Sequence, residues 1–220
     1  MSLATFPSNA SSTPYTVAFA SSRATAIGIL TPGERWEYDR LPDGGSRCDW
    51  LAGRCAAKRA IAARSGVPLE HVQLACRAGA APRCMVLDGE TWAQLPLSVS
   101  IAHCDGVAIA AAADSSIRVG VDIERVGEIA PEHLRYFLAA SERCTEASLA
   151  WVLKEAAWKA LALGPGIPFT AVQLSFDREA GSLQGVRVEG AWMAARAVVT
   201  RITRRPRLVA AVLEIGQELQ

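Results

Sequence analysis

The middle of the chain has hydrophobic positions in the patterns typical of β-strands. Two apolar runs, Leu97 to His103 and Val107 to Ala113, flank the turn residues Cys104-Asp105-Gly106, which predicts a hairpin. The next stretch, Ile117 to Glu124, alternates strictly. One face holds Ile117, Val119, Val121 and Ile123, and the other holds Arg118, Gly120, Asp122 and Glu124. We expect the first face to join the core and the second to end in two carboxylates about 7 Å apart.

A helical pattern follows at Trp151 to Leu161, WVLKEAAWKAL, which is apolar nearly all round and predicts a buried helix. It nevertheless carries Lys154, Glu155 and Lys159, and burying charges is costly unless they are paired or bound. Only three of the 23 basic residues are Lys, and two of them lie here. This usage indicates that the helix requires flexible ammonium groups at these positions rather than planar guanidinium groups. The alternative is a surface pair between Glu155 and Lys159 on an amphipathic helix.

The other elements follow from shorter apolar runs and from turn residues. Strands are expected at Tyr15 to Ala20, Ala26 to Leu30, Val72 to Cys76, Ala171 to Asp177, Val186 to Val188, Trp192 to Ile202 and Leu208 to Ile215. Helices are expected from Asp49, as N-cap, to Arg64 and from Pro131 to Leu138. Thr31 to Ser46 is predicted to be turn-rich, and a loop containing Gly79 and Pro82 is predicted to lead through Asp88-Gly89.

An internal repeat appears at an offset of 100 residues, where residues 54–74 align with residues 154–174. The matches include Gly66 with Gly166, Pro68 with Pro168, and Val72-Gln73-Leu74 with Val172-Gln173-Leu174. We therefore predict an α+β fold of two similar halves related by a pseudo-twofold axis, with the active site at their interface. The halves would span residues 15–96 and 97–220, after a flexible tail at 1–14. In this alignment Glu155 faces Cys55, so the acid belongs to the second half alone.

The composition fits a globular protein, with half of the residues hydrophobic, a fifth charged and a net charge of +1. The low net charge argues against nucleic acid as a partner. No uncharged apolar run approaches the roughly 18 residues of a membrane span, and the N-terminus lacks the features of a signal peptide. The six cysteines form no C-x-x-C pair, so we expect no disulfide framework or zinc site and a reducing cytoplasmic location.

The carboxylates at Asp122 and Glu124 are the first candidate site. Two like charges on one strand face repel each other unless a cation lies between them, which suggests a bound metal. The alternative is a solvated face of an edge strand.

Two segments together carry a family resemblance. Val119 to Glu124 (VGVDIE), followed by Trp151 to Lys159 (WVLKEAAWK), resembles the double signature of the 4′-phosphopantetheinyl transferases, roughly (V/I)-G-(V/I)-D and (F/W)-(S/C/T)-x-K-E-(A/S)-h-h-K, where h is apolar. Ser98 to Gly106 looks like the family's S-I-S-H-S-x-G, although Ala102 and Cys104 replace two serines. Trp50 to Lys58 looks like its first-half helix. The length is similar to that of the larger, monomeric, surfactin-synthetase-activating type.

The resemblance implies transfer of 4′-phosphopantetheine from coenzyme A to a serine of an apo acyl or peptidyl carrier protein, with release of 3′,5′-ADP. It also implies that Asp122, Glu124 and Glu155 hold Mg²⁺, an all-oxygen site of the kind this cation prefers. Glu155 would be the general base toward the carrier serine, directly or through a water. Lys159 would neutralise the departing ADP phosphate.

The resemblance assigns coenzyme A contacts to further basic residues. Lys154 and Lys159 would meet phosphates, and His103 would bind phosphate oxygens near the 3′-phosphate. Arg54 would meet the 3′-phosphate, and Arg83 would lie near the adenine end, which assigns that side of the ligand to the first half. The alternative for His103 is a hydrogen-bonded histidine at a strand end.

Two other functions remain open at this point. The same metal site could serve a Mg²⁺-dependent hydrolase of coenzyme A or a related nucleotide, with water as acceptor. A non-catalytic module that binds coenzyme A or a carrier is the other, and the intact set of Asp122, Glu124, Glu155 and Lys159 speaks against it. Whether the carrier serves fatty-acid, polyketide or nonribosomal-peptide synthesis is left open.

Overall fold

The computed structural model describes residues 13–24, 27–76, 80–88, 90–139, 142, 146–164, 166–176, 182–202 and 207–218. Over these residues the fold is α+β, as predicted, with three α-helices and three antiparallel sheets. Residues 1–12 of the predicted tail at 1–14 lie outside the described residues. The strands predicted at Tyr15 to Ala20, Leu97 to His103, Val107 to Ala113 and Ile117 to Glu124 are confirmed within one residue at each end.

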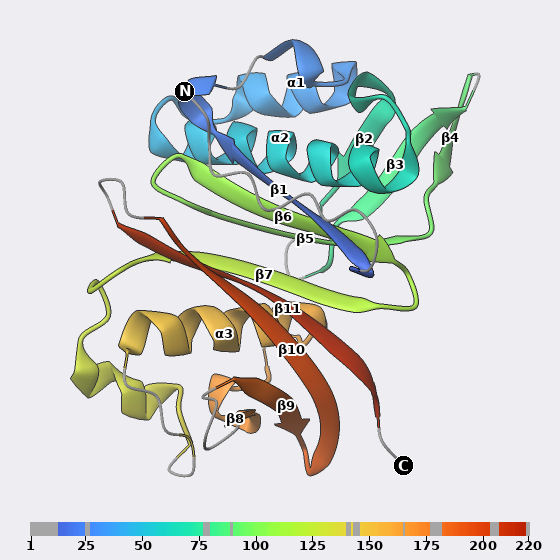
Figure 1. Cartoon of the computed structure of the whole chain (residues 1–220). Helices are drawn as coiled ribbons and strands as arrows, with labels where there is room; N and C mark the ends of the chain where they lie inside the picture. Colours follow the sequence, from blue (N-terminus) through green and yellow to red (C-terminus); the bar gives the residue numbers. More distant parts are fainter. Residues whose placement is uncertain are drawn as a thin grey trace.

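Two of the sheets form the body of the molecule (Figure 1). The first has the order β1–β6–β5, from β1 (Tyr15–Ser21), β6 (Val107–Asp114) and β5 (Leu97–Cys104). The second has the order β7–β11–β10–β9–β8, from β7 (Arg118–Arg125), β11 (Leu208–Glu218), β10 (Ala191–Ile202), β9 (Leu183–Val188) and β8 (Val172–Phe176). The sheet pairing thus joins β5 and β6 to β1, although the predicted boundary between the halves lies at residues 96/97.

A third, smaller sheet has the order β2–β3–β4, from β2 (Val72–Ala75), β3 (Arg83–Asp88) and β4 (Thr91–Gln94). The helices are α1 (Pro32–Arg40), α2 (Gly45–Ser65) and α3 (Ala147–Ala160). Short 3₁₀-helices complete the described elements: η1 (Ser22–Ala24), η2 (Ile27–Ile29), η3 (Leu69–His71), η4 (Pro131–Tyr136) and η5 (Phe169–Ala171). No helix in the described part of the chain has the length and apolar character needed to span a membrane.

The core is layered, because the two larger sheets carry apolar residues on both faces. Alanines and other small residues of α2 pack on the first sheet, with Ile61 and Val99 at this contact. On the other side, α3 packs on the second sheet through Val152 and Leu153. Between the sheets lies a third cluster, which includes Ile109 and Val121. Figure 1 shows the resulting order of layers, from α2 through the two sheets to α3.

Several elements differ from the predictions. α1 lies in the segment that is predicted to be turn-rich, and a capping box between Thr31 and Glu34 with Pro32 in the first turn starts it. η2 replaces the strand expected at Ala26 to Leu30. α2 begins at Gly45, so Asp49 lies inside the helix and is not its N-cap. β3 and β4 occupy the region predicted to be a loop.

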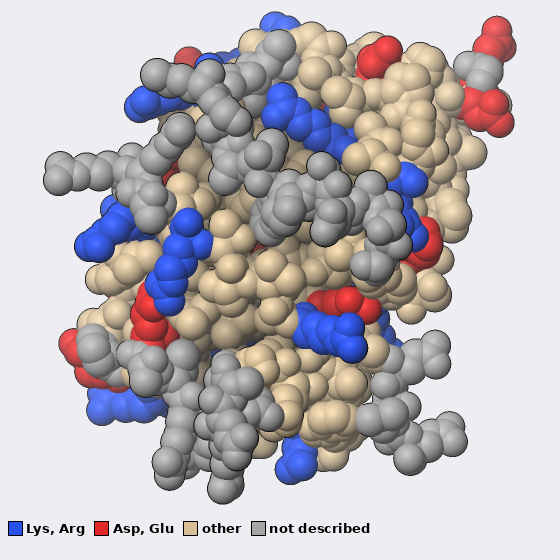
Figure 2. Space-filling view, viewed as in Figure 1, with Lys and Arg blue, Asp and Glu red and all other residues tan. Residues whose placement is uncertain are grey.

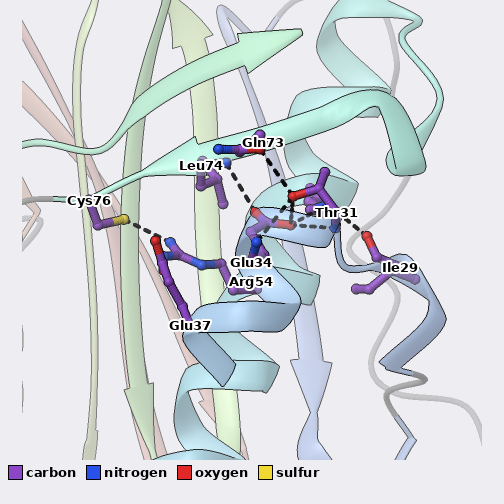
Figure 3. Close-up of polar contacts among 9 residues, drawn as sticks. Ile29, Thr31, Glu34, Glu37, Arg54, Gln73, Leu74 and Cys76 are labelled. Atoms are coloured by element: carbon purple, nitrogen blue, oxygen red, sulfur yellow. Dashed lines mark hydrogen bonds and ion pairs between the residues drawn. The ribbon is translucent and has the colours of Figure 1, made fainter. Parts of the chain in front are cut away.

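A buried ion pair holds α1 against α2 and β2 (Figure 3). Glu34 is fully buried, and Lys58 Nζ lies 2.7 Å from its Oε2 atom. The backbone amides of Thr31 and Leu74 each donate to Glu34 at 3.0 Å. Lys58 also donates to the Ile29 carbonyl at 2.6 Å. These bonds compensate the cost of burying both charges.

A second buried pair, between Lys154 and Glu142, repeats this arrangement beside α3 and β8. Lys154 Nζ lies 2.7 Å from Glu142 Oε2, and the amides of Ala139 and Leu174 donate to the same carboxylate at 2.6 Å. Lys154 also donates to the carbonyl of Val172. Each pair therefore fastens a helix to an edge strand of a sheet, β2 or β8, through a strand amide.

The surface charges agree with the balanced composition. On the face shown in Figure 2, Lys and Arg side chains are scattered, and several lie beside acidic ones. The five cysteines within the described ranges are free thiols, of which Cys55 and Cys84 are buried and Cys48 and Cys76 are exposed.

Candidate active site

The site begins where α3 crosses β7. Gly120 lies on the face of β7 that meets α3, and a Cβ at this position would stand 1.9 Å from the Ala156 carbonyl oxygen. The helix can therefore approach the strand this closely only because residue 120 has no side chain. Asp122 and Glu124 follow on the same strand face, so they point toward the helix that carries Glu155 and Lys159.

The three predicted metal ligands come together at this crossing. Asp122, Glu124 and Glu155 each offer a carboxylate oxygen, and these atoms lie within 4.8 Å of one another. Lys159 Nζ lies 2.8 Å from Asp122 Oδ1 and 3.1 Å from Glu155 Oε1. Asp122 is 3% exposed, and its Oδ2 atom has no hydrogen-bond partner among the described residues. The alternative of a solvated edge face is wrong, because the strand face is covered by α3.

Burial and crowding change the proton affinities of this group. Burial raises the pKa of Asp122 to about 7, helped by the charges of Glu155 and Glu124 and opposed by Lys159. Burial also raises the pKa of Glu124, with a further contribution from Glu155. Burial lowers the pKa of Lys159, but Asp122 and Glu155 outweigh this effect and hold its pKa above the usual value. One ammonium against three carboxylates leaves two negative charges uncompensated when all are ionised.

Aromatic side chains pack along α3. The Trp151 ring packs edge-on against Phe137, with ring centroids 5.1 Å apart, and lies tilted against Phe169 at 4.9 Å, while Trp158 stacks on Phe169 at 5.9 Å. The Trp151 indole, which can only donate, lowers the pKa of Glu124 and so opposes the larger effect of burial.

β5 and β7 run side by side in the same direction as neighbouring edges of the two sheets, and we call this contact the seam. The Val121 amide donates to Ser100 Oγ at 3.0 Å, and the Arg125 Nε donates to Asp105 at 2.8 Å. These contacts join equivalent points of the two strands, so His103 on β5 lies at the same end of the seam as Glu124 on β7.

His103 is half exposed at that end. Its Nδ1 atom lies 3.9 Å from Asp49 Oδ2, while the Gly106 amide donates to Asp49 Oδ1 at 2.6 Å. Gly53, one turn further along α2, lies against β5, since an added Cβ would stand 3.8 Å from the His103 ring. Asp49 and Gly53 together set the distance between α2 and the histidine.

The two candidate arginines lie on different elements, Arg54 on α2 and Arg83 on β3. Arg54 is 5% exposed and its Nη1 atom donates to Cys76 Sγ at 2.8 Å. Arg83 is exposed at the start of β3 and pairs with Ala75, which precedes Cys76. Both arginines therefore lie at the same end of the small sheet.

The prediction that Lys154 contacts phosphates is wrong. Its side chain is fully buried, and Glu142, Phe169 and Val172 surround the ammonium with acceptors. Burial lowers the pKa of Lys154, opposed by its bond to Glu142. The residue holds the fold together, while Lys159 faces the carboxylates.

Four contributors to the site were not predicted from the sequence as such: Asp49, Ser100, Gly120 as a packing residue, and Glu37, whose carboxylate accepts from Arg54 at 3.2 Å. Of these, only Gly120 carried a sequence signal, because a glycine inside an apolar strand indicates close approach of another backbone.

Comparison with known proteins adds no assignment: no family model and no curated protein matches the chain.

Proposed function

We propose that this protein is a 4′-phosphopantetheinyl transferase, which moves phosphopantetheine from coenzyme A to a serine of an apo acyl or peptidyl carrier protein. The observation that carries the proposal is the meeting of Asp122, Glu124 and Glu155 with Lys159 where α3 crosses β7. His103 lies at the same end of the seam. The resemblance of the two sequence segments supports the same function, since those segments build this crossing.

The carboxylate cluster fits Mg²⁺. Its donors are all oxygens, as this cation prefers, and they lie within 4.8 Å of one another. The Asp122 Oδ2 atom lacks a partner among the described residues, and the two uncompensated charges equal the charge of one divalent cation. When bound, Mg²⁺ would supply neutralisation of the coenzyme A pyrophosphate.

The residues around the cluster support a direct transfer. The serine oxygen of the carrier would form a bond to the phosphorus that bears pantetheine, and the bridging bond to the ADP phosphate would break. Glu155, whose side chain is 25% exposed, would accept the serine proton, directly or through a water. Lys159, equally exposed, would neutralise the departing phosphate of 3′,5′-ADP, and His103 would hold phosphate oxygens.

We further propose that the chain consists of two similar halves related by a pseudo-twofold axis. The matching buried pairs, Glu34 with Lys58 and Glu142 with Lys154, support this organisation. In both, the glutamate accepts the amide of a β-strand leucine, Leu74 or Leu174. By this comparison Lys154 corresponds to Lys58, whereas the sequence alignment of the repeat pairs Lys154 with Arg54.

In this correspondence the helices align at an offset of 96 residues and the strands at an offset of 100 residues, a difference of about one helical turn. The correspondence sets Glu155 against Arg59, an exposed residue that donates to the Phe19 carbonyl. The acid still belongs to one half alone, so a single catalytic centre is expected. A monomer in the cytoplasm, with no nucleic acid or membrane as partner, completes the proposal.

The test incubates the protein, coenzyme A and Mg²⁺ with a panel of apo-carriers from fatty-acid, polyketide and nonribosomal-peptide synthases. A carrier mass gain of one phosphopantetheine, with 3′,5′-ADP released only when carrier is present, supports the transferase. Release of 3′,5′-ADP at the same rate without carrier would instead support the hydrolase. Binding of coenzyme A or a carrier without either reaction would support the non-catalytic binding module.

The Glu155→Gln variant should lower transfer by about 100-fold to 10,000-fold, the range of a general base. Glu128→Gln is the matched control, because Glu128 pairs with Arg125 outside the cluster and is 55% exposed. Both variants should melt at nearly the wild-type temperature. Turnover by Glu155→Gln close to that of Glu128→Gln would remove Glu155 from the base role.

A further inference from the structure

The guanidinium of Arg54 has donor capacity left over. Its Nη1 atom donates to Cys76 and its Nη2 atom to Glu37, while its Nε atom is buried without a hydrogen-bond partner in the part of the chain described. The group also lies 4.5 Å from the centroid of the Trp50 ring. A buried guanidinium with one charged partner and an unused N–H has the chemistry of an anion site.

Glu37 and Glu34 lie three residues apart on α1 and face α2, but they are held very differently (Figure 3). Glu34 is fully buried and accepts two backbone amides as well as Lys58. The side chain of Glu37 is 48% exposed, and its carboxylate meets Arg54 at 3.2 Å. The first carboxylate anchors the helix, and the second can turn into solvent without disturbing that anchor.

We propose that Glu37 competes with the phosphate ligand for Arg54: its carboxylate occupies the guanidinium in the ligand-free protein, and a 3′-phosphate displaces it. This inference rests on the proposed function and on the family resemblance behind it, which implies that Arg54 meets that phosphate. A phosphate dianion binds a guanidinium fork more strongly than a half-exposed carboxylate does, so displacement is favourable but weakened. Because 3′,5′-ADP keeps the 3′-phosphate, Glu37 lowers the affinity for product as well as for substrate and hastens product release.

The test measures Kd by calorimetry for two nucleotides that differ only in the 3′-phosphate, 3′,5′-ADP and 5′-AMP, in the full-length protein. We expect Glu37→Gln to bind 3′,5′-ADP about fivefold more tightly than wild type, the loss of one partly exposed ion pair. The affinity for 5′-AMP should change less than about twofold, since this probe lacks the competing group.

A matched control separates competition from a general change in charge. Asp39→Asn removes a carboxylate from the same helix with nearly the same exposure, 47%, but Asp39 pairs with Arg35 and Arg47. This variant should bind both nucleotides as wild type does. In an Arg54→Gln background, Glu37→Gln should have no effect on either nucleotide, and thermal melts should show that all the variants are folded.

The outcomes separate this inference from the function on which it rests. Wild-type protein that binds neither 3′,5′-ADP nor coenzyme A overturns both. Binding of 3′,5′-ADP that falls in Arg54→Gln but is unchanged in Glu37→Gln overturns the competition alone. Equal tightening of both nucleotides, or an equal effect of Asp39→Asn, also overturns it.

Discussion

The Gly120→Ala substitution tests how the candidate site is built. The added Cβ would stand 1.9 Å from the Ala156 carbonyl oxygen, 2.7 Å from the Ala160 amide nitrogen and 2.9 Å from the Ala156 carbonyl carbon. All three are backbone atoms of α3, so no side chain can turn away to make room. A relaxed carbon-to-oxygen contact is about 3.3 Å, which requires the helix to retreat by about 1.4 Å.

This displacement should cost both stability and activity. Overpacking a close contact destabilises by about 1–3 kcal/mol, and the rigid surroundings favour the upper end. For a chain of this size, 3 kcal/mol lowers Tm by about 6–12 °C. Glu155 and Lys159 move with the helix, and a misplacement of about 1 Å at a reacting group costs about 100-fold in rate. Transfer to an apo-carrier should therefore fall by about that factor.

Gly53→Ala is the matched control. A Cβ there would stand 3.3 Å from Ile101 Cγ2, so a side chain need shift only slightly. Within a helix, the change from Gly to Ala also stabilises by up to about 1 kcal/mol. We expect this variant to melt at or above the wild-type temperature. If Gly120→Ala also melts within a degree of wild type and keeps its activity, then the close approach of α3 to β7 does not set the site.

Two further predictions concern buried charges. Lys154→Met should destabilise the protein by about 3–5 kcal/mol, because it leaves Glu142 buried without its counter-ion; urea denaturation should also show that Lys154→Met with Glu142→Gln costs less than the two single changes combined. Burial raises the pKa of Asp122 from 3.8 to about 7, so the folded state holds a proton that the unfolded state loses, and metal-free stability should fall as pH rises from 5 to 7. Asp122→Asn lacks this titration, so its free energy of unfolding should rise by about 2 kcal/mol relative to wild type between pH 5 and 7. If the difference in unfolding free energy between the two proteins stays constant with pH in the presence of a chelator, the raised pKa of Asp122 is wrong.

The strand that carries two of the carboxylates could be predicted because alternation has a direct structural meaning. A period of two assigns each residue of Ile117 to Glu124 to a face, and the structure keeps that assignment. The Asp-Gly turn of the preceding hairpin was equally readable, since Asp105 and Gly106 both adopt positive φ values, 53° and 73°.

The first helix was hidden by its composition. PGERWEYDR has few apolar residues to mark a buried face, and its Pro and Gly suggest a turn. The signal that could have found it was local: Thr31 followed three residues later by Glu34 is a capping box. Glu34 then also serves as a buried counter-ion, which only the position of Lys58 in the fold reveals.

The roles of the two lysines on α3 could not be separated by pattern alone. Lys154 and Lys159 both lie on a largely apolar helix, and helical spacing gives their angle but not which neighbour fills each side. Lys154 is buried because Glu142, from a segment without periodicity, lies beside it. Lys159 faces the carboxylates because β7 passes on that side.

The pairing of strands at the seam has a practical consequence. Among the described residues, every ladder joins strands from the same side of the turn at residues 115–117, and the two sides meet through packing and side-chain bonds such as Ser100 with Val121. A chain cut in that turn would leave His103 and Arg54 on one fragment and Asp122, Glu124 and Glu155 on the other. If the proposed function is right, neither fragment should be active alone, and recovered transfer would report their reassociation.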